Sequence, residues 1–179
     1  MKKREDHYSR KSWLLQAAEE GNTPAKYHYG LECEDADERR RWLEMAASEG
    51  YIPAMCDFAL QCEEHEDRKR WLREAAHEGY LPAMYYYGLE SDDPAIARKW
   101  LQKAAEGGYV LAMYDFAMNC TDPDEKRKWL LEAAEEGHVQ AMYQLATECE
   151  CPEARKRWLR EAANYGWQPA REQLAEIEA

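Results

Sequence analysis

The chain has 179 residues, a formal net charge of −12 and six cysteines. Because phosphate groups attract lysine and arginine, this acidic balance argues against a nucleic-acid or membrane-surface partner. The first residues, 1–4, are basic, but no apolar run follows them, so neither a signal peptide nor a membrane span is expected. We therefore expect a cytoplasmic protein whose cysteines stay reduced.

A unit of fixed length recurs six times along the chain. Each copy contains a tryptophan, and the steps between them are all 29 residues: Trp13, Trp42, Trp71, Trp100, Trp129 and Trp158. In every copy a leucine follows the tryptophan, an Ala-Ala pair comes three residues later, and a glycine closes the segment. A constant period of this length indicates a repeat array, in which each unit packs against its neighbours.

The tryptophan segment of each copy predicts an amphipathic helix. In the third copy one helical face carries Trp71, Leu72, Ala75 and Ala76. Two of these helices begin with an aspartate N-cap before a proline, at Asp93-Pro94 and Asp122-Pro123. The closing glycine is expected to end the helix in a left-handed conformation.

A basic triplet follows the acidic first turn of these helices, as in Arg39-Arg40-Arg41 and Lys126-Arg127-Lys128. One interpretation is a set of anion-binding sites. The other is a solvent-exposed helix face, because acidic residues such as Asp37 are interleaved at helical spacing. The interleaving favours the exposed face.

A second helix is predicted after each glycine and a short loop. Its centre pairs a large apolar residue with a small one, as in Tyr29-Gly30 and Phe58-Ala59. A small residue beside a large one suits two helices that cross closely.

The repeated pattern resembles the Sel-one-like repeat (SLR) family, relatives of the tetratricopeptide repeats. One copy of the signature is Ala83-Met84-Tyr85-Tyr86-Tyr87-Gly88, followed by the segment from Trp100 to Gly108. The resemblance implies an all-α, right-handed α-α superhelix (solenoid) of about twelve short helices. It implies one domain over residues 6–179, after a short basic segment, residues 1–5. The chain departs from the family by lacking the Gly-rich loop between the two helices.

The sequence offers little for catalysis. The histidines His7, His28, His65, His77 and His138 fall at different positions of the repeat and do not cluster. Cys149-Glu150-Cys151 is a poor zinc motif without a second cysteine pair. We therefore predict no catalytic residue, no cofactor and no metal site, and a protein that is not an enzyme.

One flank of the second helix is the candidate binding surface. In tetratricopeptide-like solenoids the equivalent helix lines a concave groove, so the resemblance implies a groove with a tyrosine–leucine floor and an acidic rim. The candidate residues are Tyr27, Leu31, Glu34, Cys56, Leu60, Glu63, Tyr85, Leu89, Asp92, Tyr114, Met118, Tyr143 and Glu150. The alternative is that this flank packs between repeats, and the sequence does not separate the two.

The family resemblance implies a non-catalytic scaffold or adaptor that binds a partner protein, and the acidic rim suggests a partner with a basic segment. We expect the protein itself to be a monomer. The alternative is a dedicated inhibitor or immunity-type protein that neutralises one basic partner, such as a toxin. A hydrolase-like enzyme, by analogy with secreted relatives, is opposed by the scarcity of histidine.

Overall fold

The computed structural model describes residues 2–178, with side chains from Arg10 to Glu178. Within this range the chain forms twelve helices and no strands, two helices for each 29-residue repeat, as predicted. The helices are α1 (Lys2–Glu19), α2 (Thr23–Glu32), α3 (Ala36–Ser48), α4 (Ile52–Ala59), α5 (His65–His77), α6 (Leu81–Leu89), α7 (Pro94–Glu106), α8 (Val110–Met118), α9 (Pro123–Glu135), α10 (Val139–Glu148), α11 (Pro152–Asn164) and α12 (Gln168–Glu178). Because α1 begins at Lys2, the basic N-terminal residues 2–5 are helical.

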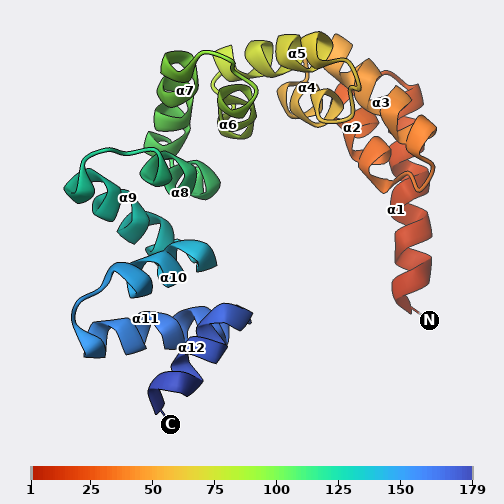
Figure 1. Ribbon diagram of the computed structural model, residues 1–179. Helices are drawn as coiled ribbons and strands as arrows, with labels where there is room; N and C mark the ends of the chain where they lie inside the picture. The colour runs from red at the N-terminus through yellow and green to blue at the C-terminus, as the bar shows by residue number, and fades with distance from the viewer. Residues whose placement is uncertain (1, 179) are drawn as a thin grey trace. The chain divides into compact units, whose positions relative to one another are not determined.

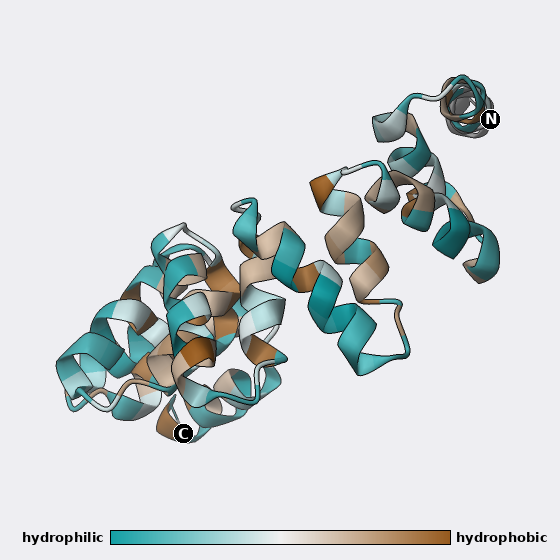
Figure 2. Ribbon diagram, turned by 90° about the horizontal axis from the view of Figure 1, so that it is seen from above, coloured by the Kyte–Doolittle hydropathy of each residue, from teal (hydrophilic) through white to brown (hydrophobic). Residues whose placement is uncertain are grey.

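The chain divides into two compact units, Met1–Glu90 with α1 to α6 and Ser91–Ala179 with α7 to α12. In each unit the odd-numbered helices, which carry the tryptophans, follow one another on one side (Figure 1). The even-numbered helices follow one another on the other side. Hydrophobic residues are interspersed with hydrophilic ones along the helices (Figure 2), and α2 to α11 each bury several apolar residues against their neighbours.

The glycine of each repeat turns the chain from an odd helix into the next even helix. All six of these glycines have positive φ angles, from +89° at Gly50 to +96° at Gly21, as the left-handed cap requires. At the end of α3 the Gly50 N–H donates to the Ala47 carbonyl at 2.9 Å, and the Tyr51 N–H donates to the Ala46 carbonyl at 3.0 Å. This is a Schellman motif, and it explains why the Ala-Ala pair keeps a constant distance from the glycine.

Aromatic ring pairs join three even helices to the odd helix that follows each of them, α2 to α3, α4 to α5 and α8 to α9. The indole of each following helix meets the ring edge-on, with centroids 5.2 Å apart for Tyr29–Trp42, 5.8 Å for Phe58–Trp71 and 5.6 Å for Phe116–Trp129. Edge-to-face pairs of this kind stabilise a fold beyond the area that they bury. The alanines beside them, such as Ala59 and Ala117, are fully buried, which lets the helices approach closely.

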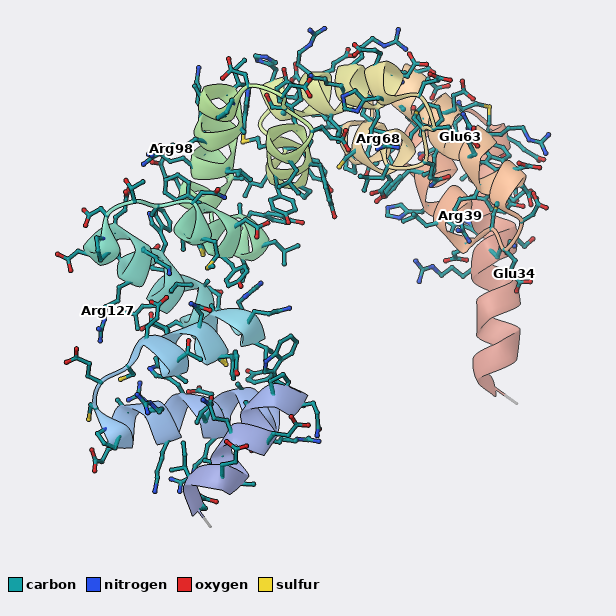
Figure 3. The ribbon with its side chains drawn as sticks, in the orientation of Figure 1. Glu34, Arg39, Glu63, Arg68, Arg98 and Arg127 are labelled. Carbon is teal, nitrogen blue, oxygen red and sulfur yellow. The ribbon has the colours of Figure 1, made fainter. Side chains whose placement is uncertain are left out.

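The three positions of the basic triplet make three different intramolecular contacts. Arg39 donates two hydrogen bonds to the Cys33 carbonyl at the end of α2, and Arg68 does the same for Cys62 at the end of α4 (Figure 3). The next position lies over a ring of the following even helix, as Arg98 lies 5.7 Å from the Phe116 centroid.

The third position of the triplet covers the tryptophan beside it, as Arg157 covers Trp158 at 4.9 Å. The basic triplets therefore stabilise the fold through specific contacts. The sequence interpretation, which favoured an exposed helix face, did not predict these contacts. The missed contacts are a helix C-cap and two cation–π contacts.

All six cysteines are unpaired. Those at the even-helix ends, Cys33, Cys62 and Cys149, are buried. The Cys33 thiol donates to the Tyr29 carbonyl at 3.3 Å, and the Cys62 thiol donates to the Phe58 carbonyl at 3.4 Å. These cysteines therefore fill small core positions.

Two adjacent glycines in unit 2 test the turn directly. Gly108 has a φ of +95°, whereas Gly107 is the C-cap of α7 with a φ of −76°. Replacing Gly108 with alanine should cost about 1–2 kcal/mol of unfolding free energy, because the Cβ meets the following carbonyl in this conformation. Gly107→Ala should be neutral or stabilising by up to about 1 kcal/mol. Urea denaturation of the two variants measures the difference, and equal effects would contradict the assigned turn.

Candidate protein-binding surface

The tyrosine row is the set of equivalent even-helix positions Tyr27, Cys56, Tyr85, Tyr114 and Tyr143. Cys56 is 1% exposed and Tyr85 is 9% exposed. Tyr27 is half-buried in unit 1, and its hydroxyl donates to Asp57 of α4 at 2.8 Å. This placement favours the second interpretation left open by the sequence, packing between repeats, most clearly for Cys56 and Tyr85. Tyr27, Tyr114 and Tyr143 keep part of their surface exposed.

One turn further along the even helices of unit 1 lies an exposed apolar row, which we call the leucine row. Leu31 in α2 is 46% exposed, Leu60 at the C-cap of α4 is 43% exposed, and Leu89 in α6 is 52% exposed. Single exposed leucines are ordinary, but three at the same position of three consecutive repeats form a repeated feature of this surface. Met118 holds the equivalent position in unit 2 and is also exposed.

The four acids of the predicted rim are exposed and lie in the loops after even helices. They are Glu34, Glu63, Asp92 and Glu150. Glu34 and Glu63 of unit 1 are labelled in Figure 3. Glu63 lines a cavity of about 250 Å³ together with Arg40 of α3 and Trp71 of α5. Glu63 therefore lies against the odd helices α3 and α5, and it is not confined to the side of the tyrosine and leucine rows.

The sequence interpretation missed an aromatic position that the structure adds to this surface. The residue after the glycine is the N-cap of the next even helix, and it carries a half-buried ring in five copies: Tyr51, Tyr80, Tyr109, His138 and Trp167. Three of these rings pack on the tyrosine row, with centroids 5.1 Å apart for Tyr27–Tyr51, 4.6 Å for Tyr114–His138 and 6.5 Å for Tyr143–Trp167. The recurrence of a ring directly after the glycine is the signal that could have revealed this position.

Burial changes the pKa of Tyr27, Tyr80 and His138 on this surface. Burial, followed by the hydrogen bond to Asp57, raises the pKa of Tyr27, and burial also raises the pKa of Tyr80. Burial lowers the pKa of His138, against the opposing effect of Asp115. Neutral His138 fits its role as a cap, because its Nδ1 accepts the Ala141 N–H at 3.2 Å. At neutral pH the surface therefore offers neutral hydroxyl and imidazole groups together with rings.

Metal-holding groups, hollows and membrane-spanning helices were sought among the described residues. Within residues 10–178, no three His, Cys, Asp or Glu side chains are grouped so that they would hold a metal ion. A hollow of about 840 Å³ is lined in the described part by residues from Asp35 to Glu49, all on or flanking α3. Of the helices described, none is long and apolar enough to cross a bilayer.

Solved structures with this fold include repeat proteins of bacteria. A Sel1 repeat protein from Oxalobacter formigenes matches 93% of the chain with a TM-score of 0.84 and 24% sequence identity. A protective antigen present in uropathogenic Escherichia coli strains, which displays an SLR fold, matches 93% of the chain with a TM-score of 0.84 and 20% identity. An immunity protein from Pseudomonas aeruginosa matches 93% with a TM-score of 0.60 and 18% identity.

The chain spans 58% of the Oxalobacter protein, 43% of the Escherichia coli antigen and 73% of the immunity protein. No protein-family model matches the sequence, and no curated protein matches it. The structural matches show that the chain has the SLR fold, an all-α solenoid, as the repeated sequence pattern predicts.

Truncating one residue of the tyrosine row and one of the leucine row should change the stability of the fold by very different amounts. Tyr85→Ala should lower the unfolding free energy by about 3 kcal/mol, because it leaves a cavity in a buried position. Leu89→Ala, four residues away on the same helix, should change it by less than about 0.5 kcal/mol. Thermal melts of the two variants compare them. A Tyr85 variant that melts like the wild type would return this position to the list of candidate binding residues.

Proposed function

We propose that this protein is a non-catalytic scaffold that binds another protein along the even helices of unit 1. The observation that carries the proposal is the leucine row, Leu31, Leu60 and Leu89, which is exposed at one position of three consecutive repeats. Burial of such residues against a partner is the main favourable term in protein association. The similarity in fold to SLR proteins supports a scaffold role.

The half-buried tyrosines beside this row suit an interface. Tyr27 and Tyr51 present ring surface that is already ordered by packing, with their centroids 5.1 Å apart. Tyrosine is enriched among the residues that dominate binding energy, because it offers a large rigid contact area and a polar tip. Ordering these rings in the free protein lowers the entropy lost on binding.

The charge of the chain favours a partner with a basic segment. The net charge is −12, and exposed acids such as Glu34 and Glu63 follow the even helices of unit 1. Such charges speed the encounter of the two proteins and make it sensitive to salt. In unit 2, Tyr114, Met118, Tyr143, Asp92 and Glu150 occupy the equivalent positions, so we propose that each unit offers its own contact surface.

A second candidate function is an immunity-type protein, which neutralises one basic partner in the cytoplasm. The fold similarity to the immunity protein from Pseudomonas aeruginosa and the acidic charge favour it. It differs from a general scaffold in having a single partner of high affinity. Co-expression with a toxic basic protein encoded beside this gene, with survival as the readout, separates the two roles.

The leucine row can be tested with a matched pair of triple variants. Leu31, Leu60 and Leu89 are changed together to asparagine, which should weaken partner binding at least about tenfold by removing apolar contact area. The control changes Met45, Ile96 and Ile177 to asparagine, because these residues are also exposed apolar side chains but lie elsewhere. Partners retained from native lysate are identified with the wild type, and the affinity of each variant for them is then measured by calorimetry.

The control variant should keep the wild-type affinity, and both variants should keep the wild-type helicity. If the leucine variant binds the partner as the wild type does, or if both variants lose binding equally, the leucine row is not the contact surface.

A further inference from the structure

Asp57 stands out on the even-helix side of unit 1. It lies on α4, is half-buried, and accepts a hydrogen bond from the Tyr27 hydroxyl at 2.8 Å on Oδ2. An ionised carboxylate can accept about four hydrogen bonds in all. Among the residues that the structure describes, no lysine or arginine forms an ion pair with it. Asp57 therefore keeps most of its acceptor capacity for another donor.

Tyr27 donates to this carboxylate, Tyr51 packs on Tyr27, and the charge of Asp57 acts on Tyr80. The Tyr51 ring lies 5.1 Å from the Tyr27 ring and is tilted by 50° to it. Tyr80, the N-cap of α6, is close enough to Asp57, Tyr51 and Cys56 for all three to raise its pKa, although burial contributes most. Tyr80 is also among the groups that raise the pKa of Tyr27, after burial and the hydrogen bond to Asp57.

The tyrosine row is interrupted next to Asp57, where Cys56 takes the place of a tyrosine. In unit 2 the N-cap ring His138 stacks on Tyr114 at 4.6 Å. In unit 1 the residue equivalent to Tyr114 is Cys56, which is buried and has no ring. Tyr80 therefore has no tyrosine of the row to stack on, unlike His138. The Cys56 thiol takes that position, and both Cys56 and Asp57 act on the pKa of Tyr80. In unit 1 the gap in the row therefore lies directly before Asp57 in the sequence.

We propose that Asp57, Tyr27, Tyr51 and Tyr80, together the Asp57 site, bind the guanidinium group of an arginine side chain from the partner protein. The inference rests on the proposed function and names the chemistry that the partner must present. A guanidinium carries five N–H donors in a plane, which suits a carboxylate flanked by phenol oxygens. Its face also stacks on aromatic rings, to which a cation is attracted.

The surroundings of the Asp57 site add a second requirement. Leu60 lies one helical turn beyond Asp57 and is exposed. Leu31 and Leu89 stand at the same position of the neighbouring even helices. The arginine of the partner's basic segment should therefore have apolar residues on both sides.

Two peptides that differ only in charge test the Asp57 site. The probes are acetyl-Leu-Arg-Leu-amide and the same peptide with citrulline, the neutral isostere, in place of arginine. Each is titrated into the full chain while the NMR signals of Tyr27, Tyr51 and Tyr80 are followed. We expect saturable shifts with the arginine peptide and binding at least about tenfold weaker with the citrulline peptide, because a charge-assisted hydrogen bond is lost.

Variants then locate the effect. Asp57→Asn should weaken the arginine peptide about tenfold, whereas Asp37→Asn, which removes an exposed carboxylate from α3 of the same unit, should leave it unchanged. Because Asp57 accepts a hydrogen bond in the fold, each variant is first checked by a thermal melt. Tyr80→Leu serves as a second variant that removes the ring and hydroxyl but keeps the carboxylate.

Several results would overturn the proposal. They are equal binding of the two peptides, unchanged binding by Asp57→Asn or Tyr80→Leu, and no binding at all. These outcomes leave the leucine-row experiment unaffected, because that experiment removes different residues. Loss of partner binding by the leucine variant together with a failed peptide test would retain the scaffold and reject the arginine site.

Discussion

The contact on which the array depends pairs the aromatic ring at the centre of α2, α4 or α8 with the tryptophan of the helix that follows it. In unit 2 the Phe116 ring has Arg98 of its own repeat 5.7 Å from its centroid, and it meets the edge of Trp129 from the next repeat at 5.6 Å. The contact between Arg98 and Phe116 lies within one repeat, whereas the contact between Phe116 and Trp129 joins two consecutive repeats. Because the ring, the cation and the indole recur at one period, the same contact can form along each unit.

This contact also determines which residues remain for binding. The rings of the even helices that meet tryptophan, such as Phe58 and Phe116, are buried. The same helices turn Leu31, Leu60 and Leu89 outward, and the N-cap rings lie half-buried between the two sets. The surface that we propose for a partner is therefore narrower than a whole tyrosine–leucine face. It consists of the leucine row, the exposed edges of tyrosines and the Asp57 carboxylate.

The sequence was sufficient to predict the helices, because each is delimited locally: the Gly50 turn depends on a positive φ, and the caps depend on residues such as Asp35 and Asp93. It was insufficient for contacts made between repeats. Arg39 looks like any surface arginine until the end of α2 is placed beside it. Likewise, periodicity cannot tell that Tyr85 is buried while Leu89, four residues later, is exposed, since both positions recur in every repeat.

A double-mutant cycle on Phe116 and Trp129 tests the central contact most directly. Phe116→Leu, Trp129→Leu and the double variant are unfolded by urea, and their free energies of unfolding are compared with that of the wild type. If the ring pair joins consecutive repeats, the two losses should be non-additive, with a coupling energy of about 0.5–1.5 kcal/mol. Losses that add to within the error of measurement would show that the two rings act independently and would contradict this account.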